Sequence, residues 1–474
     1  MKNTLELCRF LAALSAGDQG GGARAAALAG DPAEGAAERP AVYVSGEVME
    51  DIRYKTLDWL GCVIGALDKK SSAGVLEMAR EAGGNPQCSA FGLPGRTSMY
   101  MAAFSNGILG HTLEYDDVNK IAITHPGAAA LPAALAAAEY CGADFERYAL
   151  GAAAGYEVMI RLGSAVNPSH YDYWHTTGTC GTFAAAAAAG KVMGLDGEQL
   201  SRALGIAGTM ASGLVCVFGT DAKLVNVGNA VENGVKAAVL AAKGYSVPED
   251  VFEREGGYAR AVSLERDFDQ MCPQDGDELK ILDSYYKIHA SCGHTHSALD
   301  ALQKIMKKHN FTVDQVEAIE VKAYKKAVDL TGDFSCGTEL KAKFSMPYCI
   351  AAMAVYGETG LMQFTEQARS DPRVHGLKSR IKVEEDPSCT RRYPALRIER
   401  LCVKLKDGRQ WEETVELPQG KPPREYIRKK FLSLAGLTID CERASRIMGQ
   451  VLSLKMDSSM GILGEGIRGE LSGS

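Results

Sequence analysis

Hydrophobic residues recur at helical spacing through the first half of the chain, from about residue 44 to residue 245. The apolar positions that fall near a period of 3.6 residues include Val48, Ile52, Leu57, Leu60 and Ile64. Alanine, which has the highest helix propensity, dominates the later segments 129–139, 148–160 and 183–193. Because small side chains let helices approach closely, we predict a compact all-helical bundle in this half.

The hydrophobic pattern changes after about residue 282, where short segments alternate. Residues 316–321 and 380–384 alternate apolar and charged side chains, which is typical of half-buried strands. Residues 396–405 and 411–417 flank Asp407-Gly408, and this arrangement predicts a β-hairpin. Helical stretches lie between these strands, so we predict a smaller α+β domain here.

These patterns together predict a mostly α protein, with a large all-helical domain and a second, smaller α+β domain. The expected boundaries are 1–280 for the helical domain and 281–420 for the α+β domain. Residues 421–474 return to a helical pattern and are expected to rejoin the helical domain. Residues 18–40 are nearly all Gly, Ala, Asp, Glu and Arg, and we interpret them as a flexible insertion.

The composition narrows the class of partner and the compartment. The formal net charge is -7 over 474 residues, so the overall charge of the chain does not favour binding to nucleic acid or anionic lipid. Thirteen scattered cysteines fit free thiols in a reducing compartment, and no long apolar span is present, so we expect a cytoplasmic protein. Attraction for an anionic substrate must then come from local Lys, Arg and His.

A first polar cluster spans residues 111–117 and continues at 124–127. An acidic segment runs into a loop, and His125-Pro126 opens an alanine-rich helix. A helix N-terminus has free N–H groups and a favourable dipole, so a carboxylate is its natural occupant. The alternative is that Asp116 and Asp117 only cap helices.

Two further clusters precede small-residue helices. Residues 170–182 combine His175 with Thr177 and two glycines, and so offer hydroxyl and N–H donors to a bound anion. Residues 221–230 place Lys223 before a helix, where it can pair with a substrate carboxylate. A surface lysine is the alternative interpretation of Lys223.

Residues 287–296 and 343–349 hold the last candidates. Cys292, His294 and His296 look superficially like metal ligands, but their spacing matches no zinc pattern, so we expect no metal. Tyr348 can donate to an oxyanion or be a core aromatic residue. Walker, G-x-S-x-G and CxxC motifs are absent, and a terminal G-x-G-x-x-G spacing at Gly464 has no strand before it, so we expect no cofactor.

These clusters, in this order, resemble the MmgE/PrpD family, which includes 2-methylcitrate dehydratase, cis-aconitate decarboxylase and iminodisuccinate epimerase. The matching strings include GHTLEYDDVN, THPGAAALPAALAAAE, HTTGTCGTFAAAAAAGKVMGL, KIHASCGHTHSALDAL and KFSMPYCIAAMAVYG. They cover roughly residues 48–434. The resemblance implies a helical large domain, a smaller α+β domain, a site between them, a homodimer and no cofactor.

The resemblance also assigns residues to the site. The expected catalytic residues are His125, His175, Asp117, Glu114, Lys223 and Tyr348. The expected substrate-binding residues are Lys287, His296, Thr177 and Cys292. Four features depart from the decarboxylase-like pattern: Glu114 replaces an Asp, Cys292 replaces a His, Asn226 stands where a His is common, and the segment 117–125 is one residue longer.

These departures weigh against itaconate-forming decarboxylation. We therefore expect a cofactor-independent lyase, a dehydratase resembling 2-methylcitrate dehydratase, that acts on a small di- or tricarboxylic acid by general acid–base catalysis. An epimerase or isomerase, a decarboxylase, and a non-catalytic carboxylate-binding protein are the alternatives. The sequence leaves open which histidine is the acid and which is the base.

Overall fold

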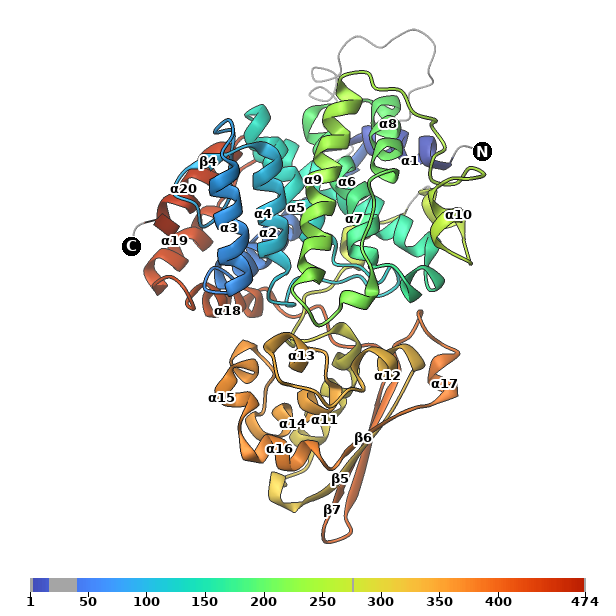
Figure 1. The fold of residues 1–474 in the computed structure, drawn as a ribbon, viewed down its shortest axis with the longest axis vertical. Helices are drawn as coiled ribbons and strands as arrows, with labels where there is room; N and C mark the ends of the chain where they lie inside the picture. The colour runs from blue at the N-terminus through green and yellow to red at the C-terminus, as the bar shows by residue number, and fades with distance from the viewer. Residues whose placement is uncertain (1–2, 17–40, 275–276, 473–474) are drawn as a thin grey trace.

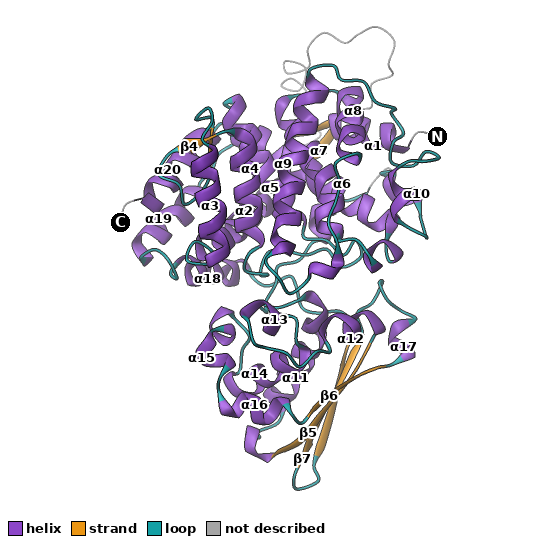
Figure 2. Cartoon of the chain, viewed as in Figure 1, coloured by secondary structure: helices purple, strands orange, loops and turns teal. Residues whose placement is uncertain are grey.

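The computed structural model describes residues 3–16, 41–274 and 277–472. The insertion predicted at residues 18–40 lies outside the described residues. The fold is mostly helical, and its longer strands gather in one smaller α+β part (Figure 2). This confirms the predicted fold class. The boundaries at residues 280 and 420 stay a prediction.

The large part is a bundle of helices (Figure 1). Its helices are α1 (Asn3–Ala12), α2 (Gly46–Gly65), α3 (Lys70–Ala82), α4 (Met99–His111), α5 (Pro126–Cys141), α6 (Phe145–Val166), α7 (Thr176–Met193), α8 (Gly197–Gly208), α9 (Ala222–Ala242) and α10 (Tyr258–Val262). Short strands pair as β1 (Leu14–Ala16) with β2 (Val42–Val44) and β3 (Cys88–Ser89) with β4 (Arg96–Thr97). Helix α7 is buried along most of its length and packs on α5, α6 and α9. A Cβ added at Gly234 of α9 would lie 2.4 Å from Cβ of Ala185, so glycine permits this close packing.

The C-terminal helices lie beside the first half of the chain. They are α18 (Arg424–Ala435), α19 (Cys441–Leu452) and α20 (Met460–Ser472). Helix α18 packs on α2, where a Cβ added at Gly61 would lie 3.3 Å from the ring of Phe431. Figure 1 shows these helices in red on the side of the molecule where the blue helices α2 and α3 lie.

The smaller part contains a four-stranded sheet in the order β6-β5-β7-β8. The strands are β5 (Val316–Ala323), β6 (Ile381–Glu385), β7 (Glu399–Leu405) and β8 (Gln410–Val415). Strand β5 runs parallel to β6 and antiparallel to β7. Strands β7 and β8 form the predicted hairpin, and Gly408 at its turn has a φ of 90°, which favours glycine.

Helices pack against this sheet because alternate residues of β5 are apolar. Val316, Ile319 and Val321 are buried, whereas Glu317 and Glu320 are exposed. Helices α11 and α14 contact the sheet and each other. The helices of this part are α11 (His296–Lys308), α12 (Lys325–Thr331), α13 (Glu339–Lys343), α14 (Met346–Tyr356), α15 (Glu366–Arg369), α16 (Pro372–Lys378) and α17 (Pro387–Thr390).

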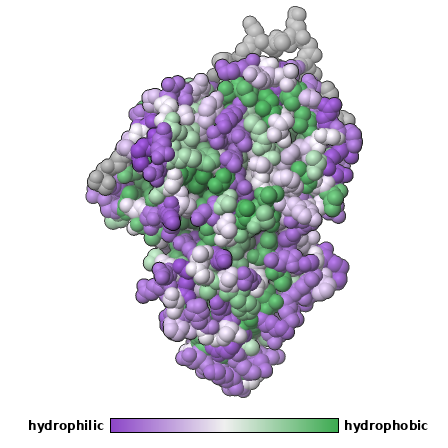
Figure 3. Space-filling model, in the orientation of Figure 1, coloured by the Kyte–Doolittle hydropathy of each residue, from purple (hydrophilic) through white to green (hydrophobic). Residues whose placement is uncertain are grey.

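The two parts meet along a seam formed by distant segments of the chain. The hydrophobic core of the sheet-containing part includes Leu113 and Tyr115, which belong to the loop between α4 and α5. That loop therefore lies at the seam. On the face drawn in Figure 3, hydrophobic patches lie among hydrophilic residues on the helical part and near the seam, whereas the far end of the sheet-containing part is mainly hydrophilic. Among the helices described, none is long and apolar enough to cross a membrane.

Candidate active site

A small cavity that opens to solvent lies at the seam, and the empty space in and around it is about 390 Å³. Both parts of the molecule supply its walls. The helical part contributes Glu114, Val118, Ile123, Thr124, His125, Tyr171, His175, Thr177, Phe218 and Lys223. The sheet-containing part contributes Cys292, Gly293, His294, Phe344 and Arg397.

Three helices begin at this cavity. Helix α5 starts after His125 and α7 starts after His175, so both histidines are N-cap residues. Neither side chain caps its own helix, which leaves each imidazole available to the cavity. Lys223 lies in the first turn of α9. Because helix N-termini carry free N–H groups and partial positive charge, this wall favours an anion.

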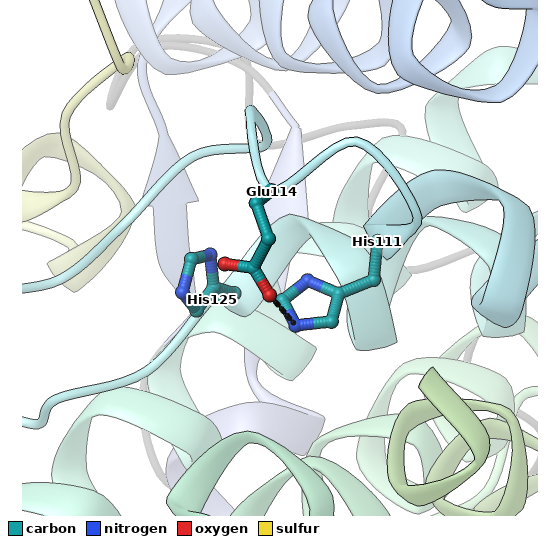
Figure 4. Close-up of side chains that lie close together, drawn as sticks. All are labelled: His111, Glu114 and His125. Atoms are coloured by element: carbon teal, nitrogen blue, oxygen red, sulfur yellow. Dashed lines mark ion pairs between the residues drawn. The ribbon is translucent and has the colours of Figure 1, made fainter. Parts of the chain in front are cut away.

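A buried chain of polar contacts runs behind the cavity wall. The ammonium of Lys223 donates to the Glu114 carboxylate and, over 2.9 Å, to Nε2 of His111. On the other side of the ring, Nδ1 of His111 lies 2.8 Å from Oδ2 of Asp116. A carboxylate only accepts, so His111 carries its proton on Nδ1. Figure 4 shows the Glu114 carboxylate between the rings of His111 and His125.

The two cavity histidines are held neutral by burial. Burial lowers the pKa of His125 to about 4, although Nδ1 lies 3.1 Å from the Asp116 carboxylate, which acts in the opposite direction. Burial also lowers the pKa of His175 well below its usual value, and the nearby Lys223 lowers it further. Both imidazoles are therefore uncharged at neutral pH.

The acid on the wall is held ionised. Burial alone would raise the pKa of Glu114, but the positive charge of Lys223, together with that of Lys287, outweighs burial and holds that pKa below its usual range. Glu114 has a φ of 53°, in the left-handed region that residues other than glycine seldom adopt. Strained backbone of this kind is common where a loop must point one side chain in a fixed direction, here the Glu114 carboxylate toward Lys223.

The structure brings six of the ten predicted site residues to the cavity surface. These are Glu114, His125, His175, Thr177, Lys223 and Cys292. The hydroxyl of Thr177 accepts the backbone N–H of His125 over 3.2 Å and so links the starts of α5 and α7. Burial raises the pKa of the Cys292 thiol, which therefore stays protonated.

The other four predicted residues lie behind the cavity or away from it. Nζ of Lys287 donates to the backbone oxygen of Glu114 over 2.8 Å and so supports that residue from behind. Asp117 accepts the N–H of Gly127 and the hydroxyl of Tyr156. The remaining two lie in the sheet-containing part. Tyr348 donates to the backbone oxygen of Gln363, and His296 contacts the backbone oxygen of Ser291.

Sequence reasoning missed three residues that this geometry makes prominent: His111, Asp116 and Arg397. His111 and Asp116 stand in the acidic cluster that the sequence marked, but nothing in the pattern tells which of its side chains turn inward. Arg397 comes from the strand-rich block and has no motif around it. Only the fold brings it to the cavity.

His111, Glu114 and His125 have potential metal-ligand atoms within 4.8 Å of one another (Figure 4). Two histidines and a carboxylate are a common zinc ligand set. However, the ammonium of Lys223 already contacts both Glu114 and Nε2 of His111. A metal ion would have to displace that ammonium, so the cluster fits a lysine better than a metal.

Comparisons with known proteins agree with the resemblance seen in the sequence. Residues 33–271 match the MmgE/PrpD N-terminal domain, and residues 289–455 match the MmgE/PrpD C-terminal domain. The chain belongs to the MmgE/PrpD family. The cavity of this MmgE/PrpD protein takes residues from both matched regions.

Relatives of this MmgE/PrpD chain carry two kinds of name. The cis-aconitate decarboxylase-like protein oryM of Aspergillus oryzae is 28% identical over 460 residues, which cover 90% of this chain and 94% of that protein. The cis-aconitate decarboxylase of Aspergillus terreus is 27% identical, over 87% of this chain and 90% of that protein. The 2-methylcitrate dehydratase-like protein oryR of Aspergillus oryzae is 35% identical over 115 residues, 22% of this chain and 23% of that protein.

Proposed function

We propose that this chain is a lyase that acts on a small di- or tricarboxylic acid by general acid–base catalysis, without a cofactor. One observation carries the proposal: two neutral histidines share a cavity with two cations, Lys223 and Arg397. Neutral imidazoles can move protons, and the cations can hold carboxylates and stabilise the charge that develops beside them.

We assign the role of base to His125. The carboxylate of Asp116 lies 3.1 Å from Nδ1, outside hydrogen-bond geometry, but its negative charge favours a proton on Nδ1 and leaves a lone pair on Nε2. That lone pair can take a proton from a substrate carbon next to a carboxylate. Asp116 would then stabilise the imidazolium that forms, and Lys223 would stabilise the charge on the substrate.

We assign the role of acid to His175. The side-chain amide of Asn226 lies 3.3 Å from Nδ1 of His175 and can donate to it. Because Nδ1 then accepts, the proton of the neutral ring sits on Nε2. An N–H there can protonate a leaving hydroxyl. The pair supplies both proton transfers that elimination of water requires.

Dehydration is the reaction that this geometry supports best. Loss of water begins with removal of a proton from carbon, which requires a neutral base, and burial keeps both histidines neutral. Decarboxylation is a second candidate, favoured by the names of the relatives that match along most of the chain. Decarboxylation needs a proton donor to carbon but no base, so it uses only one of the two histidine roles.

A substrate panel in deuterated water tests the proposal. The purified protein is incubated with citrate, 2-methylcitrate, cis-aconitate and malate, and the products are followed by NMR. Loss of water with a new alkene supports the dehydratase, and release of CO₂ supports the decarboxylase. Deuterium exchange without an alkene supports an epimerase or isomerase instead. Binding of these acids with no turnover of any of them would contradict the proposed activity and support a binding protein.

We also propose that the protein is a cytoplasmic homodimer. The thirteen cysteines, all of them in the described residues, are free thiols, which supports a reducing compartment. The homodimer rests on the family resemblance. Sedimentation equilibrium of the purified protein should give twice the mass of one chain, and a single-chain mass would contradict it.

A further inference from the structure

We propose that Arg397 forms a second carboxylate subsite, which makes the cavity selective for tricarboxylates over dicarboxylates. The inference rests on the proposed function, in which the substrate is a small polycarboxylate. It adds a residue that neither the sequence motifs nor the family resemblance assigned.

The guanidinium of Arg397 is buried and lacks an anionic partner. The residue is 2% exposed and lines the cavity just before strand β7. Nη2 donates to the backbone oxygen of Lys120 over 2.9 Å, across the seam, whereas Nε has no hydrogen-bond partner. Within the described ranges, no carboxylate forms an ion pair with it. An arginine is always charged, and a buried charge is unfavourable unless it is paired. The site would therefore bind an anion favourably.

The surroundings of Arg397 are built for a polar ligand. A Cβ added at Gly293 would lie 3.3 Å from Nη1 of Arg397 and 3.6 Å from the hydroxyl of Tyr285. The guanidinium thus lies close to glycine backbone, where a larger residue would crowd it. The Tyr285 hydroxyl is also buried without a hydrogen-bond partner. Arg397, whose Nε lacks a partner, and Tyr285, whose hydroxyl lacks one, both come close to Gly293, and together they can bind the two oxygens of a carboxylate.

The two cations of the cavity come from opposite sides of the seam. Lys223 belongs to helix α9 of the helical part, and Arg397 belongs to the sheet-containing part. Lys223 lies with the two histidines and with the starts of α5 and α7, so this side of the cavity would hold the two carboxylates of the reacting unit. Arg397 is then available for a third carboxylate. An acid with three carboxylates, but not one with two, therefore uses both sides of the seam.

Binding of citrate and malate tests this subsite, because malate lacks one carboxymethyl arm of citrate. Both acids are titrated by calorimetry into the wild type, Arg397→Met and Arg397→Lys. Arg397→Met should weaken citrate binding about 100-fold, as expected for loss of a buried charge pair, and should leave malate binding within about threefold. Arg397→Lys should weaken citrate binding less. Lysine keeps the positive charge but cannot form the paired hydrogen bonds that a planar guanidinium makes with a carboxylate.

Arg400→Met is the matched control, because Arg400 is 43% exposed and pairs with Asp386. It should bind both acids like the wild type. Circular dichroism and the unfolding midpoint show whether each variant is folded, and Arg397→Lys carries the test if Arg397→Met does not fold. Unchanged citrate binding in a folded Arg397 variant, or equal weakening of both acids, overturns the subsite alone. A wild type that binds neither acid overturns the subsite and the proposed function together.

Discussion

At the scale of single residues, Glu114 holds two buried lysines together. Its carboxylate accepts from Lys223 and lies 3.7 Å from Nζ of Lys287. We predict that Glu114→Gln lowers the free energy of unfolding by about 3–5 kcal/mol, because two buried lysines lose their shared anion. Urea unfolding at pH 7 measures this. Glu320→Gln, on the exposed face of β5, is the control and should change the stability by less than about 0.5 kcal/mol.

His170 gives a prediction for acid stability. Its Nδ1 donates to the backbone oxygen of Val262, and its Nε2 accepts from the hydroxyl of Thr179. Burial lowers its pKa to about 4, whereas the unfolded value is near 6.5. Between these pH values the unfolded chain binds the proton and the folded chain does not, so stability falls as the pH drops.

The expected loss from His170 is about 3 kcal/mol between pH 7 and pH 4. Comparing denaturant unfolding of the wild type and His170→Gln over this range isolates it, because all other titrating groups are shared. The wild type should lose stability more steeply with acid. Parallel curves for the two proteins would show that His170 takes up no extra proton on unfolding.

The sequence predicted the acidic loop but not the direction of each side chain. It favoured Asp117 and left Asp116 as a possible helix cap. In the structure Asp116 lies beside His111 and His125, whereas Asp117 binds Gly127 and Tyr156. Adjacent loop residues point apart according to backbone torsions, such as the positive φ of Glu114, and no residue pattern specifies these torsions.

At the scale of secondary-structure elements, the site depends on where helices begin. The sequence predicted that His125-Pro126 opens a helix, and α5 does begin at Pro126. Proline at the first helical position is a strong local signal, so this start could be predicted. The meeting of α5, α7 and α9 at one cavity could not, because it depends on packing between segments far apart in the sequence.

The start of α5 is held by a tight contact that gives a third prediction. A Cβ added at Gly127 would lie 2.6 Å from Oδ1 of Asp117 and 2.7 Å from the hydroxyl of Tyr156. We predict that Gly127→Ala displaces this end of α5, lowers the unfolding midpoint and reduces kcat about tenfold or more through the neighbouring His125.

Thermal unfolding and steady-state kinetics measure both effects of Gly127→Ala. Gly449→Ala in helix α19 is the control, because a Cβ there meets nothing within 4 Å. It should be neutral or slightly stabilising, since alanine favours helix by up to about 1 kcal/mol. Equal behaviour of the two variants would mean that the contact at Gly127 does not hold α5.

At the scale of the whole molecule, the site exists because two parts of different architecture share a seam. The change from helical to alternating hydrophobic period predicted both parts, since these periods reflect which faces are buried. Arg397 shows what the sequence could not supply. Its neighbours at the cavity, such as Tyr171 and His175, lie more than 200 residues away in the chain.

The most direct test of the account is the kinetics of His125→Ala with the acid that the substrate panel identifies. The account predicts a folded variant whose kcat falls about 10²–10⁴-fold, the contribution expected of a general base. KM should change less, because the proposed carboxylate contacts of Lys223 and Arg397 are kept in this variant. His375→Ala, at an exposed position of α16, should keep wild-type kinetics. A folded His125→Ala variant with near-normal kcat would contradict the account.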